Sequence, residues 1–491
     1  MKKVLSLSLI FITVIILYHP ALFTYFSQDD FYHFKVSQAD TLAKFINNLG
    51  IHSFEERGIA FYRPVSRELL FGLYYPIFGL NSLPFRLFSF LIHFLNIYLV
   101  YLLVQRFFNK RYLSFFVSFF FGITAANVAT LYYLAGGIQT LLATTFTLSC
   151  LLLFPKYKSL SFLSFVAAIT SHEQAIIIPF LLFGLCLIRS SRKEIRNHLF
   201  GLIPYFLAIS ALLFIEFFKI GFSSTEQQYQ AVFDIKRTLN SLAWYSFWAL
   251  GLPETLIDFV MPGLKLNPNL LKYWGNYYQL IFPSFVIFLV LFIFSVLILI
   301  FKNNTIFKNK HFLFCLLWFP LGLSPVLLLP LHKSTHYLAI SLLSFWLILG
   351  FIIFNTFDLI KTKQPLLAKT FIYLFISSLV ILSTTSAILG STNYWAASRG
   401  KIARQLITEV KAKFPTLPKG STLYFKNDPN YPYLTKEWGG SSRQASIILN
   451  GNDALQLLYN DSTIKVFYQD IGYPPEGYNN EKIFEIQAKI F

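Results

Sequence analysis

Charged residues are scarce in this chain. Only 13% of its 491 residues are charged, about half of the ~25% that is typical of soluble proteins. This scarcity, together with 55% hydrophobic residues, argues against a soluble globular protein. Cysteine is also rare: Cys150, Cys186 and Cys315 all lie in apolar stretches without a partner at metal-ligand spacing. We therefore expect neither a disulfide framework nor a zinc site.

Acidic residues are especially few, with 23 Asp and Glu against 41 Lys and Arg, which gives a net charge of +18. In a soluble domain this excess would indicate a nucleic-acid partner. Here much of it lies in short loops between apolar blocks, and no nucleic-acid-binding motif accompanies it. The pattern is typical of a membrane protein whose basic loops face the cytoplasm and anionic lipid, so we expect no nucleic-acid partner.

Long apolar blocks are what the sequence has in abundance. A helix needs about 20 such residues to cross a bilayer, and uniformly apolar blocks exclude the alternating strands of a barrel. The sequence therefore predicts an all-α polytopic membrane protein with about 11 transmembrane helices. They lie at about 4–26, 84–107, 111–127, 137–155, 159–171, 173–189, 198–218, 279–301, 312–331, 336–357 and 366–389.

Basic residues predict the orientation of these helices. Five short connections are basic, and the positive-inside rule places them in the cytoplasm together with the N-terminus. Their residues are Arg106, Lys110 and Arg111; Lys156 and Lys158; Arg189, Arg192, Lys193 and Arg196; Lys302, Lys308 and Lys310; Lys361 and Lys363. The loops at about 27–83 and 219–278, and the C-terminus, are then outside. Within the second loop, the apolar stretch 240–261 predicts a helix lying in the membrane interface.

The composition divides the chain into two parts. Residues 1–389 form the predicted transmembrane domain, and residues 390–491 become polar and rich in turns. Arg399 to Phe414 predicts an amphipathic helix, and STLYF, ASIIL, IKVFY and KIFEI predict short strands. We expect a small α/β or α+β domain on the outer side. Abundant Phe, Ile, Lys and Asn indicate a bacterial chain, and hence the plasma membrane.

An acidic pair, Asp29 and Asp30, follows the first apolar block. A carboxylate near another carboxylate, or partly removed from water, has a raised pKa and can act as a general base. Ionisable groups at the membrane surface often mark function. The alternative interpretation is a helix N-cap, where Asp is common.

Basic side chains on the same side of the membrane could bind a phosphate. Arg63 and Arg67 lie in the first outer loop, and Lys333 and His336 lie in a later junction. The alternative for the two arginines is an interfacial arginine paired to lipid headgroups or to Glu68. For Lys333 and His336 it is interfacial anchoring. His332 and His336 are four residues apart, but no local carboxylate accompanies them, so we expect no metal.

His172 and Glu173 form a further polar pair between two apolar blocks. They could orient an acceptor or tune the acidic pair. The alternative is a tight turn in which Glu173 caps the next helix. Tyr337 directly follows His336 and joins the candidates for positioning a substrate.

Taken together, these residues resemble the GT-C glycosyltransferases, and most nearly the protein O-mannosyltransferases and related dolichyl-phosphate-mannose-dependent enzymes. The resemblance covers about residues 1–390. It rests on the acidic pair after the first helix, the YRPVS segment at Tyr62–Ser66, and the helix Phe85–Phe108 with its histidine and asparagine. The pairs His172-Glu173 and His336-Tyr337 approximate two further motifs, although histidine replaces the family's usual lysine and arginine there.

The resemblance implies a GT-C-like fold and an inverting transfer of a sugar from a polyprenyl-phosphate donor to an acceptor hydroxyl. It makes Asp29 or Asp30 the catalytic base, and we favour Asp30 slightly. Lys333, His336, Arg63 and Arg67 would stabilise the donor phosphate, and His172, Glu173 and Tyr337 would position substrate. The acceptor would be a glycan, a lipid or a protein, and no other cofactor is implied.

Three alternatives remain at this stage. A flippase or transporter of lipid-linked glycans would share the helix count, but the sequence has no paired repeats. A glycan polymerase or ligase would depend more on outer-loop arginines than on an acidic pair. A non-catalytic membrane scaffold would bind partners through its C-terminal domain and would not need the acidic pair.

Overall fold

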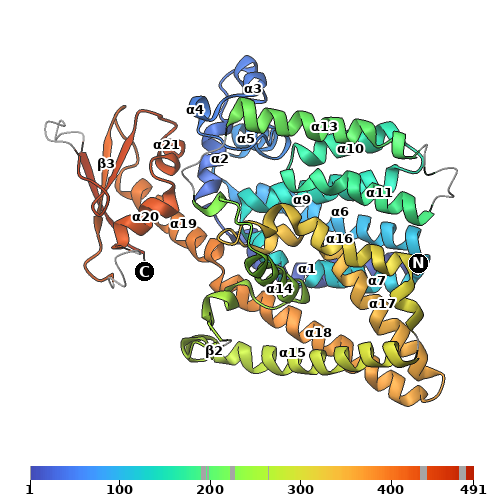
Figure 1. Ribbon diagram of the computed structural model, residues 1–491. Helices are drawn as coiled ribbons and strands as arrows, with labels where there is room; N and C mark the ends of the chain where they lie inside the picture. Colours follow the sequence, from blue (N-terminus) through green and yellow to red (C-terminus); the bar gives the residue numbers. More distant parts are fainter. Residues whose placement is uncertain are drawn as a thin grey trace.

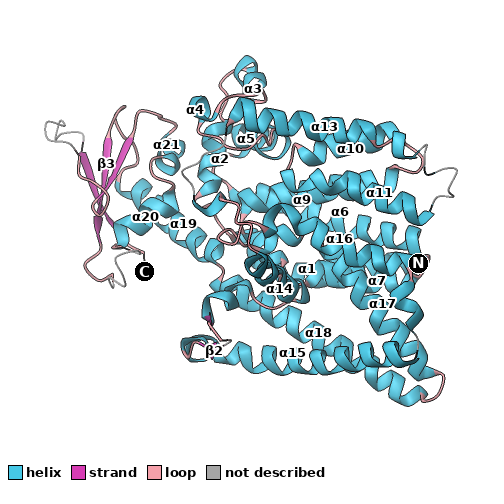
Figure 2. Ribbon diagram, viewed as in Figure 1, coloured by secondary structure: helices cyan, strands magenta, loops and turns pink. Residues whose placement is uncertain are grey.

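Long apolar helices make up most of the structure, a computed structural model that describes residues 2–490 except 190–194, 196–197, 222–226, 264, 303, 432–438 and 475–482. Each predicted apolar block overlaps one helix of a bundle (Figures 1 and 2). These helices are α1 (Lys2–Tyr18), α6 (Ser82–Phe108), α7 (Arg111–Ile123), α9 (Leu134–Leu153), α10 (Lys158–Ile169), α11 (Ile178–Arg189), α13 (Ile203–Phe214), α15 (Asn269–Lys302), α16 (Lys310–Leu327), α17 (Leu342–Lys361) and α18 (Pro365–Asn393).

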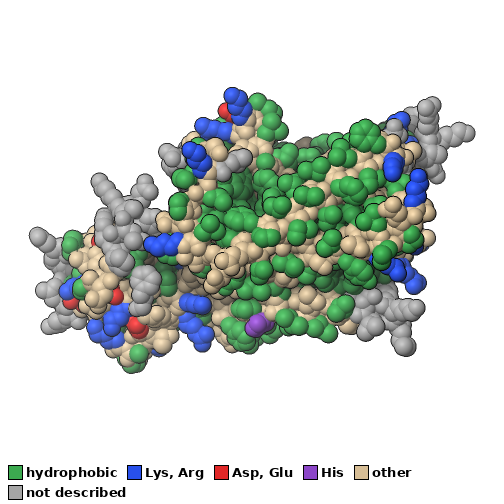
Figure 3. Space-filling view, turned by 90° about the horizontal axis from the view of Figure 1, so that it is seen from below, with side chains coloured by type: hydrophobic (Ala, Val, Ile, Leu, Met, Phe, Trp, Pro, Cys, Tyr) green, Lys and Arg blue, Asp and Glu red, His purple; other side chains and the backbone are tan. Residues whose placement is uncertain are grey.

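The bundle has the length and the surface of a membrane-spanning body. Within the described residues, 7 helical segments are long and apolar enough to cross a membrane, and four shorter apolar helices accompany them. Figure 3 shows a broad band of hydrophobic side chains across the body, with Lys and Arg gathered toward its ends. The prediction of a polytopic all-α membrane protein is confirmed. Of the predicted basic connections, Arg192, Lys193 and Arg196 lie outside the described residues.

The two ends of the bundle differ. In Figure 1 the N-terminus lies at one end, and the C-terminal domain projects from the other. The loops at about 27–83 and 219–278, which are predicted to lie outside, are called the first and second outer loops. The first folds at the domain's end into α2 (Asp29–Ser37), α3 (Leu42–Asn48), α4 (Phe54–Arg57) and α5 (Leu70–Phe78). A short helix, α8 (Asn127–Tyr132), precedes α9.

The second outer loop contains α14 (Ile235–Leu250) and a small antiparallel hairpin of β1 (Val260–Met261) and β2 (Lys265–Leu266). The stretch predicted as one interfacial helix, 240–261, is broken after Leu250. Gly251 has a φ of 111°, and a short 3-10 turn, Glu254–Phe259, follows. A positive φ at glycine ends the helix at no steric cost.

Buried polar side chains join α6 to its neighbours. Asn96 donates to the Leu141 carbonyl at 3.0 Å and accepts from the Thr145 hydroxyl at 2.7 Å, both in α9. The Nε2 of His93 lies 3.3 Å from the Gly122 carbonyl in α7. These contacts tie spanning helices together where lipid offers no hydrogen-bond partner.

The C-terminal domain is α/β. It contains α19 (Trp395–Lys413), β3 (Thr422–Asn427), α20 (Ser441–Leu449), α21 (Asp453–Tyr459), β4 (Lys465–Tyr468) and β5 (Ile483–Ala488). The strands form a parallel sheet in the order β4-β3-β5, with Thr422 paired to Lys465 and to Ile483. Parallel neighbours need crossover connections, and α20 and α21 form the one from β3 to β4.

One predicted strand is wrong. The segment ASIIL at 445–449 lies in α20 and not in the sheet. A short apolar run is compatible with either element. Ala445, Ile448 and Leu449 are buried, and their spacing of three and four residues places them on one helix face.

A second hydrophobic core joins the C-terminal domain to the first outer loop. It unites aromatic residues of the loop and of α6, among them Phe26, Phe34 and Phe85, with Leu406 of α19 and Ile448 of α20. The C-terminal domain therefore packs directly on the segment that carries the acidic pair. The boundary at residues 389 and 390 remains a prediction.

Candidate active site

A cavity of about 670 Å³ lies where the first outer loop, the start of α9, the segment before α17 and α19 meet. Every candidate residue from the sequence except Asp30 and Glu173 lines it. These lining residues are Asp29, Arg63, Arg67, His172, Lys333, His336 and Tyr337. Residues that are more than 300 positions apart in the chain therefore line one polar cavity, at the end of the bundle that carries the C-terminal domain.

The two acidic residues occupy different environments. Asp29 is exposed at the cavity wall, and its Oδ2 accepts a hydrogen bond from the Tyr133 hydroxyl, with 2.5 Å between the two oxygens. Asp30 is 1% exposed. Its Oδ2 accepts the Ser27 N–H at 3.1 Å, and its Oδ1 accepts the Ala135 N–H at 2.8 Å. Asp29 thus faces the cavity, whereas both carboxylate oxygens of Asp30 accept hydrogen bonds from backbone N–H groups.

Burial raises the pKa of Asp30 to about 6, against the opposing effects of the Arg86 charge and the two N–H donors. Arg86 is completely buried and donates to the carbonyls of Thr24, Tyr25, Leu131 and Tyr132 at 3.0–3.2 Å. Together Arg86 and Asp30 fix the chain segments on either side of Asp29. The hydrogen bonds described for both side chains are all to backbone groups.

Arg63 and Glu173 meet in a bidentate ion pair. The distances are 2.8 Å from Nε to Oε2 and 2.5 Å from Nη2 to Oε1, and Arg63 also donates to the Gln139 side chain. The pair joins the first outer loop to the junction of α10 and α11. Bidentate arginine–carboxylate pairs have fixed geometry and are stronger than neutral hydrogen bonds. The Arg63 charge is therefore neutralised in this state.

Arg67 is also paired with a carboxylate. Its Nε lies 2.8 Å from the Glu68 Oε1, and its Nη2 donates to the Phe61 carbonyl at 2.8 Å. Arg57 lies 3.6 Å from the same Glu68 carboxylate. These contacts make Arg67 part of the cavity wall.

The segment before α17 carries the remaining basic candidates. Lys333 is half-buried, burial lowers its pKa, and no described carboxylate lies within salt-bridge distance of it. His336 is 6% exposed, and its Nδ1 lies 2.9 Å from the Ser334 hydroxyl. Burial holds the pKa of His336 well below its usual range, which favours the neutral imidazole. His336 therefore contributes a hydrogen bond and not a charge.

Histidine and tyrosine rings line the wall beside this segment. The Tyr337 ring lies 4.0 Å from that of His336 and 5.8 Å from that of His172, measured between centroids. The His172 Nδ1 accepts the Gln174 N–H at 3.1 Å. His172 thus caps the turn that begins with Glu173, and its ring packs against Tyr337.

Several lining residues were missed in the sequence. Glu254 follows the broken interfacial helix, and its carboxylate accepts the Thr335 N–H at 2.8 Å and the Ser334 hydroxyl at 3.2 Å. It thereby shapes the segment that carries Lys333. Others include Gln28, Tyr133, Trp395, Arg399 and Asn450. Of these missed residues, only Glu254 had a local signal, as a carboxylate within an apolar stretch.

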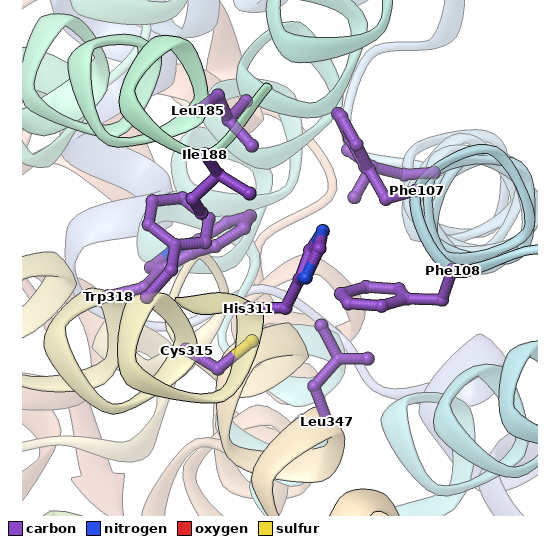
Figure 4. Close-up of a pocket in the computed structure, with 10 residues that line it drawn as sticks. Phe107, Phe108, Leu185, Ile188, His311, Cys315, Trp318 and Leu347 are labelled. Carbon is purple, nitrogen blue, oxygen red and sulfur yellow. The ribbon is translucent and has the colours of Figure 1, made fainter. Parts of the chain in front are cut away.

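Among the described residues, no group of three or more His, Cys, Asp or Glu side chains could hold a metal ion. A second pocket, lined by His311, Cys315, Trp318 and apolar side chains of α6, α11 and α17, is shown in Figure 4. Its volume is about 10 Å³, which is at the lower limit of what a single water requires. The larger cavity is the candidate active site.

Fold and site together define a polytopic α-helical membrane protein with a polar cavity beneath a small α/β domain. No protein-family profile matches the chain, and no curated protein is similar to it in sequence. Among solved structures, it is similar to the archaeal oligosaccharyltransferase AglB from Archaeoglobus fulgidus, in a complex with an inhibitory peptide and a dolichol-phosphate. The identity is 11% and the TM-score is 0.45, over 91% of this chain and 63% of that protein. The chain thus spans less than two thirds of the length of that protein.

Proposed function

We propose that the chain is a membrane glycosyltransferase that moves a sugar from a polyprenyl-phosphate donor to an acceptor hydroxyl. One observation carries the proposal. A carboxylate without a basic partner within salt-bridge distance, Asp29, and a lysine without a carboxylate partner, Lys333, line the same cavity among the described residues. A base and a separate cation facing one space are what an attack on a sugar phosphate requires.

In the proposed reaction, Asp29 takes the proton of the acceptor hydroxyl. The hydroxyl oxygen forms a bond to the anomeric carbon of the donor sugar, and the bond from that carbon to the phosphate oxygen breaks. Polyprenyl phosphate leaves with the electron pair. Attack from the face opposite the phosphate inverts the anomeric configuration. We assign the base to Asp29 instead of Asp30, because the oxygens of Asp30 already accept two backbone N–H groups.

The developing charge on the phosphate needs a cation. We assign this role to Lys333, with the neutral His336 as a hydrogen-bond donor beside it. Arg63 and Arg67 have carboxylate partners and are assigned to the cavity wall. His172 and Tyr337 would position substrate from the same wall, and Glu173 would act through Arg63.

The proposal includes an orientation with the N-terminus in the cytoplasm and the cavity outside. The two termini lie at opposite ends of the bundle (Figure 1), and the basic connections lie at the N-terminal end. In sealed, right-side-out spheroplasts, added protease should therefore cleave the C-terminal domain and spare a tag on the N-terminus. Protection of the domain with cleavage of the tag would reverse the orientation.

The test of the function is sugar transfer by the purified chain in lipid vesicles. Radiolabelled mannose, glucose and N-acetylglucosamine would be offered as polyprenyl phosphates, with extracted cell-envelope glycans, lipids and proteins as acceptors. We expect label in one acceptor class. Lys333→Gln should lower kcat/KM for the donor about 10- to 150-fold, since a charge-assisted contact contributes roughly 1.5–3 kcal/mol. Lys401→Gln, an exposed lysine of α19 outside the cavity, serves as the control.

Folded protein that transfers none of these sugars would contradict the proposal. The same vesicles then test the flippase alternative, because the labelled lipid would move between leaflets without any change of its sugar. A scaffold would do neither.

A further inference from the structure

Gln28, the residue before Asp29, has a backbone conformation that favours glycine. Its φ is 50° and its ψ is −118°. A residue with a Cβ in such a sparsely populated region costs of order 1–3 kcal/mol and persists only where its surroundings hold it. Such residues concentrate at functional sites. The question is therefore which contacts hold Gln28.

Two hydrogen bonds of Gln28 come from the C-terminal domain, beside the one that its carbonyl accepts from the Phe31 N–H at 3.0 Å. The Gln28 N–H donates to the Ile448 carbonyl of α20 at 2.9 Å. Its side-chain Oε1 accepts from the Arg399 Nη1 of α19 at 2.7 Å. The Arg399 guanidinium lies 5.3 Å from the centre of the Trp395 ring, which fixes its own position. The C-terminal domain thus contacts both the main-chain N–H and the side chain of Gln28.

The contact between α19 and the loop is close. A Cβ placed on Gly400 would lie 2.7 Å from the Tyr25 carbonyl oxygen, so only glycine lets the helix approach this near. The second hydrophobic core surrounds the contact with residues of both segments. The C-terminal domain is therefore seated on the loop through a tight apolar interface, with the Gln28 contacts at its cavity edge.

We propose that the C-terminal domain positions the catalytic base: Arg399 and the Ile448 carbonyl hold Gln28 so that the Asp29 carboxylate faces the cavity. The role of Asp29 as base rests on the function proposed above. Arg399 is a positioning residue here, and it acts on Asp29 through Gln28. Asn450, at the end of α20, also lines the cavity, so the domain forms part of the wall as well.

The kinetic test compares Arg399→Ala, Arg399→Lys, Gln28→Ala and the double variant Gln28→Ala/Arg399→Ala. A misplacement of about 1 Å costs on the order of 10²-fold in rate, so we expect kcat of Arg399→Ala to fall about 10- to 100-fold while both KM values stay within about twofold. Arg399→Lys should recover part of kcat. The double variant should equal the worse single variant, because both remove one contact. Lys401→Ala, exposed on the same helix, should leave kcat unchanged.

A readout that needs no activity separates this inference from the proposed function. Hydrogen exchange of the amides in residues 25–31 should speed up in Arg399→Ala and stay unchanged in Lys401→Ala. Faster exchange without sugar transfer by the wild type would overturn the function and leave the positioning contact standing. Unchanged exchange, unchanged kcat, additive single variants, or a rise in KM alone would each overturn the positioning role.

Discussion

Replacing Asp29 by Asn should lower kcat for sugar transfer by about 10²–10⁴-fold, the range that a general base contributes. The carboxylate lines the cavity, and among the described residues its hydrogen-bond partner is the Tyr133 hydroxyl, so an acceptor can approach it. Asn keeps the shape but cannot take a proton. Initial rates at saturating donor and acceptor, on protein that elutes as a single species, measure the effect. Full activity in Asp29→Asn would exclude it as the base.

Asp30→Asn is the matched comparison. Its amide group cannot accept one of the two N–H bonds, so we expect a loss of stability of about 1–3 kcal/mol but a much smaller loss of kcat per folded molecule. A larger kcat loss in Asp30→Asn than in Asp29→Asn would move the base to Asp30.

The contribution of the Asp30 carboxyl to the free energy of unfolding should decrease as the pH rises. Its folded-state pKa of about 6 lies above the value of ~3.9 for an unfolded chain, so the folded state binds this proton more tightly. The stabilising contribution is complete below about pH 4 and is lost as the pH rises through about 6. The melting-temperature advantage of the wild type over Asp30→Asn should therefore shrink between pH 4 and pH 7. A constant or growing advantage would contradict the burial of this carboxyl.

Breaking the Arg63–Glu173 pair should have the largest effect on stability. The side chains are 14% and 26% exposed, and removing one partner leaves the other charge largely buried. We expect Arg63→Ala and Glu173→Ala each to cost about 3 kcal/mol. The double variant should cost less than the sum, because it leaves no isolated charge. The effect is measured as the fraction of protein that stays folded after heating, determined by size-exclusion chromatography.

Lys44→Ala is the matched control, because the Lys44–Asp40 pair lies in the same outer loop but is 49% and 86% exposed. An exposed pair contributes about 0–1 kcal/mol. If Arg63→Ala lost no more stability than Lys44→Ala, the buried pair would not hold the loop against the α10–α11 junction.

The helices of the bundle could be predicted because their cause is local. The block at 84–107 became α6, Ser82–Phe108, and the block at 279–301 lies within α15, Asn269–Lys302. Lipid requires each crossing segment to satisfy its own backbone hydrogen bonds, so about 20 apolar residues in a row determine a helix. The five residues of ASIIL carried no such constraint, and the strand predicted there was wrong.

The sequence by itself determined that this is a polytopic membrane protein and where its helices lie, and it indicated some of the polar residues that line the cavity. Only the tertiary structure decided which of two adjacent carboxylates faces the cavity, and that Arg63 pairs with Glu173. It alone brought Arg399 to Gln28, across 371 positions of the chain. Helix hydrogen bonds join residues four apart, whereas these contacts depend on how distant segments pack, and no local pattern encodes that.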